Sequence, residues 1–158
     1  MRILALALAL AAALSAQKYD GPRPPKPDVP YLLHAARLIP TDVDEAKEDK
    51  RKEGTAFVTT GAAAKARTPL AEPIFLFESK SIPPEKLSLY KLDVKTGNRE
   101  VFFFDNPKKR KDSSKQLRIS ATRVAPGLYR LEPTEPLPNG EYTLTPADSN
   151  TVFSFTIY

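Results

Sequence analysis

Residues 140–158 read GEYTLTPADSNTVFSFTIY, and the spacing of their side chains decides the fold. In the last part of this stretch every second residue is apolar: Phe153, Phe155 and Ile157. The residues between them, Ser154 and Thr156, are polar. Because neighbouring side chains of a β-strand point to opposite faces, this spacing predicts a strand with one buried face. The turn residues 148–150 separate it from a second predicted strand at Glu141–Thr145.

The same two-residue spacing continues back through the chain as far as Gly54, without intervening helical patterns. The predicted strands are Thr55–Thr59, Ile74–Glu78, Leu87–Lys95, Arg99–Asp105, Gln116–Val124, Leu128–Glu132, Glu141–Thr145 and Val152–Tyr158. Turn sequences separate several of them, and residues 95–98, KTGN, are typical of a β-hairpin. About eight short strands at this spacing predict an all-β, antiparallel β-sandwich domain over residues 54–158.

The residues just before the last two predicted strands form a sharper pattern. Leu137, a turn that ends at Gly140, and Tyr142 resemble the tyrosine corner of bacterial immunoglobulin-like and fibronectin-like sandwiches. The resemblance implies that the Tyr142 hydroxyl binds upstream backbone and that Leu137 packs beneath the turn. The chain has no Cys and no Trp, which excludes antibody-type domains. The chain as a whole resembles small exported bacterial proteins, and neither likeness implies an activity.

Residues 1–16 are typical of an export signal. Arg2 is followed by an apolar run from Ile3 to Leu14 and then by the small residues Ser15 and Ala16. An apolar helix of about 12 residues spans only about 18 Å, too short for a hydrocarbon core of ~30 Å. We therefore expect cleavage after Ala16, or after Ser15, and a mature chain without a transmembrane segment. The expected location is the periplasm, the cell surface or the outside of the cell, and the alternative reading is a buried N-terminal helix.

Three kinds of sequence occupy residues 17–53, ahead of the predicted sandwich. Residues 20–30 contain five prolines and predict a stiff, extended N-terminal arm. Residues 31–39 are mainly apolar, which suits a short helix or an edge strand, and the prolines on either side favour an extended segment. Such a segment packs on its own sandwich or adds a strand to a neighbouring molecule. Residues 41–53, TDVDEAKEDKRKE, predict a short charged helix or tether, with acids in its first turn and bases in its last.

The sequence offers no clear catalytic group, metal site or cofactor site. His34 is the only histidine, and no Gly-x-Ser-x-Gly motif accompanies it. Asp42, Asp44 and Glu45 are close in sequence but lack the glycine-containing loop of a calcium site. The absence of Cys excludes thiolate ligands, a Cys nucleophile and a lipid-modified N-terminal Cys. We therefore expect a protein that is not an enzyme and that carries no cofactor.

Two segments are candidates for contact with other molecules. The N-terminal segment offers apolar side chains: Tyr31, Leu32, Leu33, Leu38 and Ile39. A predicted loop at residues 106–115, NPKKRKDSSK, offers cations: Lys108, Lys109, Arg110, Lys111 and Lys115. These cations would attract acidic polymers, or would keep the neighbouring strand with Phe102–Phe104 from aggregating. No aromatic residues alternate with them in the sequence, so specific nucleic-acid recognition is not predicted.

These observations lead to two expected functions. The first is an exported, non-enzymatic structural or surface-assembly protein, whose arm adds a strand to another copy of itself and builds a filament. The alternative is a monomeric binding module for envelope polysaccharide or another acidic polymer. A sugar site would use exposed aromatic rings, for which Tyr31, Tyr90 and Tyr158 are the candidates among the tyrosines.

Overall fold

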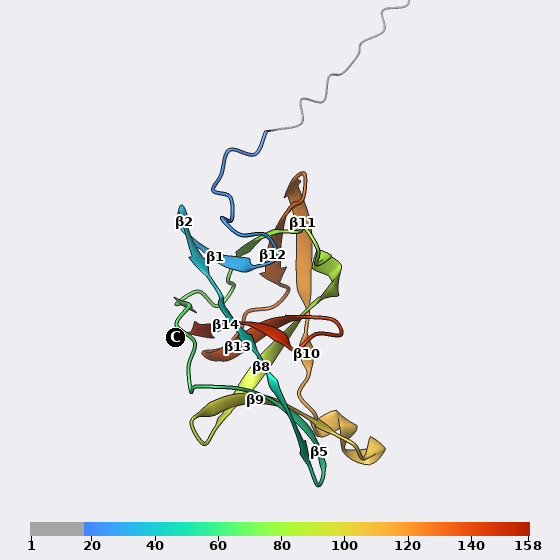
Figure 1. The fold of residues 1–158 in the computed structure, drawn as a ribbon. Helices are drawn as coiled ribbons and strands as arrows, with labels where there is room; N and C mark the ends of the chain where they lie inside the picture. Colours follow the sequence, from blue (N-terminus) through green and yellow to red (C-terminus); the bar gives the residue numbers. More distant parts are fainter. Residues whose placement is uncertain (1–17) are drawn as a thin grey trace, which may run out of the picture.

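The structure is a computed structural model that describes residues 18–158, and in this range the chain folds into two sheets of mainly antiparallel strands. The export signal predicted at residues 1–16 lies outside the described residues. The prediction of an all-β fold is confirmed at the level of two packed antiparallel sheets (Figure 1).

The smaller sheet has five strands that all pair antiparallel with their neighbours. Their order is β11 (Ile119–Ala125), β12 (Leu128–Pro133), β7 (Phe75–Glu78), β1 (Pro30–His34) and β2 (Arg37–Pro40). Its two outer strands, β11 and β2, come from distant parts of the sequence. The sheet therefore joins the N-terminal segment to the middle of the chain.

The larger sheet has nine strands. Seven follow one another in the order β3 (Asp42–Glu45), β14 (Thr151–Ile157), β13 (Gly140–Pro146), β8 (Leu87–Lys95), β9 (Asn98–Phe104), β5 (Gly54–Thr59) and β4 (Lys47–Arg51). Two short strands pair beside this path: β10 (Gln116–Leu117) with β8, and β6 (Arg67–Thr68) in parallel with β14. Two 3-10 helices complete the fold, η1 (Pro84–Lys86) and η2 (Pro107–Asp112).

The two end strands of this order, β3 and β4, are consecutive in the chain and are separated only by Ala46. β3 pairs with β14, and β4 pairs with β5 at the other end of the sheet. Ala46 is buried, and its N–H donates a hydrogen bond to the carbonyl of Asn150 (2.8 Å). The larger sheet therefore curls round until one continuous segment joins its two ends, and we call it the rolled sheet.

All eight strands predicted from residue 54 onward are present, with the stretch 116–124 divided between β10 and β11. The predicted hairpin joins β8 to β9 through Thr96 and Gly97, which both have positive φ (47° and 76°). Positive φ at both central residues is the conformation that lets a two-residue turn follow the twist of the strands.

The core lies between the smaller sheet and the outer face of the rolled sheet. Phe75 of β7 meets Phe155 of β14 edge to face, with ring centroids 4.9 Å apart, and Tyr142 of β13 stacks on the same Phe155 ring at 5.5 Å. Leu32, Phe77 and the predicted inward residues Phe153 and Ile157 belong to the same buried set. The two-residue spacing of the last strand therefore places its apolar side chains in the core.

Tyr142 also makes the hydrogen bond that the tyrosine-corner pattern describes. Its hydroxyl donates to the carbonyl of Pro138 (2.6 Å), four residues upstream. Leu137 is buried beside it, and its N–H donates to the carbonyl of Ala71 (2.7 Å). Gly140, the first residue of β13, has a φ of 156°, a backbone conformation that side chains disfavour. These contacts fasten the turn before β13 to the rest of the molecule.

The prediction of a charged helix at residues 41–53 is wrong, because this segment forms the strands β3 and β4. A helix with polar residues all round has no apolar stripe to bury, whereas an edge strand needs only the backbone of a neighbour to pair with. Asp42 adds two hydrogen bonds, accepting from the N–H groups of Lys65 (2.7 Å) and Ala66 (3.1 Å). The boundary predicted at Gly54 lies inside the β4–β5 hairpin, so residues 30–53 belong to the same folded unit.

The apolar N-terminal segment forms the β1–β2 hairpin, and β1 pairs with β7 of the same molecule. Of the two placements expected for this segment, the structure has the one on the protein's own sandwich: Tyr31 and Leu32, named as candidates for contact with another molecule, lie in the core with 5% and 2% of their surface exposed. Leu33, Leu38 and Ile39 are half-buried on the same hairpin. The segment packs in this way because β7 would otherwise leave an apolar edge without a hydrogen-bonding partner.

Asp28 fixes the chain just ahead of this hairpin. Its carboxylate accepts hydrogen bonds from the N–H groups of Lys80 (2.9 Å), Ser81 (2.9 Å) and Ile82 (3.0 Å). Burial by itself raises the pKa of Asp28, but the three N–H donors outweigh this effect and hold the pKa below its ordinary value of 3.8. The carboxylate therefore stabilises the fold in its ionised form.

The Tyr142→Phe substitution removes one hydrogen bond and leaves the packing of the ring unchanged. We expect the free energy of unfolding to fall by roughly 1 kcal/mol, measured by urea denaturation. Tyr158→Phe serves as the control, because Tyr158 is 55% exposed. Equal stability of the two variants would show that the corner hydrogen bond does not hold the turn.

The Asp28→Asn substitution tests how the N-terminal segment is attached. Since the pKa of Asp28 is lowered by folding, its stabilising effect is present above pH 3.8 and is lost as the pH falls through the folded-state value. We expect the variant to be less stable than the wild type at pH 7 and to approach it as the pH falls below the folded-state pKa of Asp28, again by urea denaturation. A difference that does not change with pH would contradict this role, and Asp20→Asn, at an exposed position, is the matched control.

Candidate functional site

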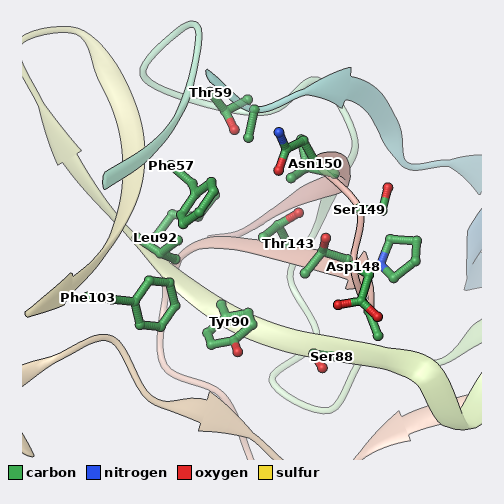
Figure 2. Close-up of a pocket in the computed structure, with 16 residues that line it drawn as sticks. Phe57, Thr59, Ser88, Tyr90, Leu92, Phe103, Thr143, Asp148, Ser149 and Asn150 are labelled. Atoms are coloured by element: carbon green, nitrogen blue, oxygen red, sulfur yellow. The ribbon is translucent and has the colours of Figure 1, made fainter. Parts of the chain in front are cut away.

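The inner face of the rolled sheet encloses a pocket of about 330 Å³, shown in Figure 2. Strands β5, β8, β9, β13 and β14 contribute to its walls, together with Ala46 and the loop between β13 and β14. The lining residues are Ala46, Phe57, Thr59, Ser88, Tyr90, Leu92, Val101, Phe103, Thr143, Thr145, Pro146, Ala147, Asp148, Ser149, Asn150 and Val152. The pocket therefore exists because the sheet curls back on itself.

Three aromatic rings form one side of the pocket. Phe103 of β9 lies edge to face with Phe57 of β5 (centroids 6.1 Å apart, 69°) and with Tyr90 of β8 (5.9 Å, 86°). Figure 2 shows the three rings together beside Leu92. Each ring is on the inner face because its strand alternates: Phe102 and Phe104, the neighbours of Phe103, point the other way. Apolar surface is thus concentrated on one side of the pocket.

Hydroxyl and amide groups form the other side. Thr143 and Thr145 project from β13, and the loop residues Asp148, Ser149 and Asn150 lie across the pocket from the rings (Figure 2). The Thr145 hydroxyl donates to the carbonyl of Thr151 (2.8 Å), which holds the two ends of this loop together. Asp148 is the only charged residue among those lining the pocket. The pocket therefore suits a ligand with apolar faces and hydrogen-bonding groups, and the part of the chain that the structure describes offers it no cation for an anionic ligand.

The space for the rings arises where β8 and β9 separate. The two strands pair only between residues 93–95 and 98–100. Beyond this point Ser113 and Ser114 bind β9 through their hydroxyls, which accept from the N–H groups of Phe104 and Phe102 (2.9 Å each). The next residues, Gln116–Leu117, pair with β8. The segment 113–117 thus holds the two strands apart without leaving their backbone groups unpaired.

A buried ionic network lies on the same inner face, next to the pocket. Arg99, of which 2% is exposed, is paired in register with the lining residue Thr59. Its guanidinium donates to the carbonyls of Gly61 (2.9 Å) and Thr60 (3.0 Å) and lies 3.8 Å from the Glu141 carboxylate. Glu141 accepts in turn from the Thr156 hydroxyl (2.8 Å) and from the N–H of Ala64 (3.0 Å). The network fastens the loop after β5 over this end of the rolled sheet.

The residues predicted from the sequence fall in four separate places. Of the tyrosines considered for sugar binding, Tyr90 lines the pocket, Tyr31 is buried in the core, and Tyr158 lies under the Arg67 guanidinium at 4.5 Å. Within the basic loop predicted at residues 106–115, residues 107–112 form the short exposed helix η2, and no residue of the loop lines the pocket. The β1–β2 hairpin belongs to the other sheet.

Sequence reasoning missed Phe57, Phe103 and the two threonines of β13 as lining residues. Their strands were predicted, but a two-residue spacing shows only that two faces differ and not which face is concave. The run Phe102–Phe104 did indicate that rings would point to both faces of its strand. The missing information was the closure of the sheet through residues 42–51, which were predicted as helix.

Other kinds of site find no support in the described part of the chain. Within residues 18–158, no three His, Cys, Asp or Glu residues lie together as a metal site would require. His34 is exposed on the β1–β2 hairpin. Over the same range, no helix has both the length and the apolar character needed to span a membrane.

The Arg99→Met substitution tests the buried network. It leaves the Glu141 carboxylate buried without a cation nearby, and breaking a buried pair in this way typically costs about 3–5 kcal/mol. We expect a loss of about 3 kcal/mol in the free energy of unfolding, measured by urea denaturation. Lys91→Met, at an exposed position of β8, should have little effect. Equal stabilities for the two variants would show that the network does not hold the rolled sheet.

Three comparisons bear on what this chain resembles. No family model, no curated protein and no solved structure matches it.

Proposed function

We propose that this protein is an exported, non-enzymatic binding module whose pocket in the rolled sheet holds a neutral sugar unit of an envelope polysaccharide. The observation that carries the proposal is the arrangement of the pocket walls, with three aromatic rings on one side and hydroxyl and amide groups on the other. The export signal expected at residues 1–16 supports the compartment.

The chemistry of a sugar fits both walls. A pyranose ring has C–H faces that pack on aromatic rings and an equatorial edge of hydroxyls that exchange hydrogen bonds. Tyr90 and Phe103 supply the aromatic surface, and Thr143, Ser149 and Asn150 supply donors and acceptors. The volume of about 330 Å³ lies at the small end of the ~300–1,000 Å³ range of small-molecule pockets, which suits one or two sugar units.

The charge of the lining residues decides whether a neutral or an acidic sugar fits the pocket better. Among residues 18–158, Asp148 is the only charged residue that lines it, and no Lys or Arg of this range does so. A carboxylate or phosphate in the pocket would lose its hydration without gaining a cationic partner, which is costly. A neutral sugar is therefore favoured over an acidic one in this pocket.

The structure gives less support to assembly through the N-terminal segment. Strand addition to a neighbour would have to remove Tyr31 and Leu32 from the protein's own core, where both are almost completely buried. It would also break the pairing of β1 with β7. These losses favour the binding module over the strand-adding subunit.

Kinship with immunoglobulin-like sandwiches is a second part of the proposal. The hydrogen bond from Tyr142 to Pro138 and the buried Leu137 support it. The rolled sheet is a departure from two simple facing sheets, and it is this departure that provides the pocket.

The Tyr90→Ala substitution tests the proposed function. Four sugars serve as probes: N-acetylglucosamine, chitobiose, cellobiose and maltose. Each is titrated into ¹⁵N-labelled protein, and the amide signals are followed by NMR. We expect at least one sugar to shift the amide signals of residues 145–150 and 101–103. Tyr90→Ala should weaken the binding of that sugar by tenfold or more, because the substitution removes one of the three rings of the aromatic wall.

Tyr158→Ala is the matched control, because Tyr158 lies outside the pocket and is already exposed. It should bind the sugar as the wild type does. The proposal is contradicted if none of the four sugars shifts the pocket signals, or if Tyr90→Ala binds as well as Tyr158→Ala. Sedimentation of the mature protein as a concentration-dependent polymer would instead support the structural role.

A further inference from the structure

We propose that the end of the molecule formed by the β4–β5 hairpin and helix η2 is a second binding surface, which takes an acidic polysaccharide. Two basic segments meet there although about 55 residues separate them in the sequence: residues 50–52 (KRK) and residues 108–111 (KKRK). Figure 1 shows the start of β5, at the turn of the β4–β5 hairpin, and the coil of η2 close together at the bottom of the view. We call this surface the basic end.

Glu53, in the turn of the β4–β5 hairpin, joins the two segments. Its carbonyl accepts a hydrogen bond from the N–H of Asp105 (3.0 Å), and its carboxylate lies 2.9 Å from the Lys109 ammonium. The backbone bond ties the hairpin turn to the chain just before η2. The juxtaposition of the two basic segments is therefore built into the fold rather than left to flexible side chains.

Some cations of this end already have protein partners. Arg51 donates two hydrogen bonds to the Glu100 carboxylate (2.9 and 2.6 Å) and one to Asp49 (2.8 Å). Its hydrogen bonds hold the pKa of Glu100 below the ordinary value, so this pair stays ionised at neutral pH. Lys109 is paired with Glu53.

Other cations have no such partner. Within residues 18–158, four exposed basic side chains of this end form no ion pair: Lys52, Lys108, Arg110 and Lys111. Lys115, which follows η2 in the sequence, is also exposed, and the exposed carboxylates that flank or end η2 are those of Asp105 and Asp112. The free charge is thus predominantly positive, and it lies on a surface that the pocket does not share.

Two aromatic rings lie beneath the paired cations. Phe102 and Phe104 face outward from β9 and meet edge to face at 4.8 Å. The Arg51 guanidinium lies 5.9 Å from the Phe102 ring and the Lys109 ammonium 5.6 Å from the Phe104 ring. These cation–π contacts hold the two basic side chains in place and occupy the rings. The sequence showed no aromatic residues among the cations, but the fold brings them together.

The same contacts decide what kind of polyanion fits. Single-stranded nucleic acid is bound by stacking bases on open aromatic faces, and here the rings are half-buried and occupied by Arg51 and Lys109. A membrane surface is bound by apolar side chains that protrude, which η2 lacks because none of its residues is apolar apart from Pro107. A polysaccharide with a carboxylate on each unit needs only spaced cations and hydrogen-bond donors. The basic end therefore fits a polyuronate.

The test uses the mature full-length chain and oligomers of polygalacturonate, with binding followed by isothermal titration at several salt concentrations. We expect binding that weakens steeply with salt. The double variant Lys108→Glu/Lys111→Glu should bind at least tenfold more weakly, and Lys52→Glu, in the other segment, should also weaken binding several-fold. Neither change touches the ion pairs of Arg51 or Lys109, and circular dichroism checks that the fold is kept.

The matched control is Lys65→Glu/Lys80→Glu, which changes the net charge equally at exposed lysines elsewhere. It should bind polygalacturonate within about twofold of the wild type. Equal losses in both double variants would overturn the proposal, because the effect would then come from net charge alone. So would an unchanged affinity in Lys52→Glu, absence of binding by the wild type, or tighter binding of single-stranded DNA of equal charge. Because this surface shares no residue with the pocket, Tyr90→Ala should bind polygalacturonate normally, whatever its effect on neutral sugars.

Discussion

The backbone pairing of residues 42–51 is the constraint on which the rest of the structure depends. The first part of this segment pairs with β14 and the second with β5, at opposite ends of the strand order, and Ala46 is the pivot between them. The pivot is fixed by its own burial and by the hydrogen bond to Asn150. Without this pairing the larger sheet would have two open edges, and Phe57 and Val152 would not face a common space.

The rolled sheet has two surfaces of different character, and both follow from strand alternation. Its outer face is apolar and packs on the smaller sheet through residues such as Phe153 and Phe155. Its inner face carries rings and hydroxyls around the pocket and the ionic network of Arg99 and Glu141 beside it. The polar residues that alternate with the apolar ones in the last two strands, such as Thr143 and Ser154, thus line an interior. An interior of this kind can offer hydrogen bonds to a ligand, which an apolar core cannot.

Local pattern predicted much of this fold. The eight strands after residue 54 were predicted because alternation and turn residues are properties of neighbouring residues. The prediction of a helix at 41–53 was wrong. Acids followed by bases suit a helix dipole, but the conformation of this segment depends on the strands it pairs with, which are far away in the sequence. The sequence left open for the same reason whether Tyr31 and Leu32 pack on their own molecule or on a neighbour, since strand pairing within one molecule and between two molecules uses the same side chains. Of the site, Tyr90 was named as a candidate, but its partners from β5 and β9 required knowledge of the closure.

Nuclear Overhauser contacts across the strand at residues 42–51 test the central claim most directly. The account predicts cross-strand contacts between Val43 and Phe153 and, in the same molecule, between Asp49 and Ala56. Together these contacts would show that one segment joins both ends of the rolled sheet. Contacts between residues three apart along 41–53, as in a helix, or the presence of only one of the two cross-strand sets, would contradict it.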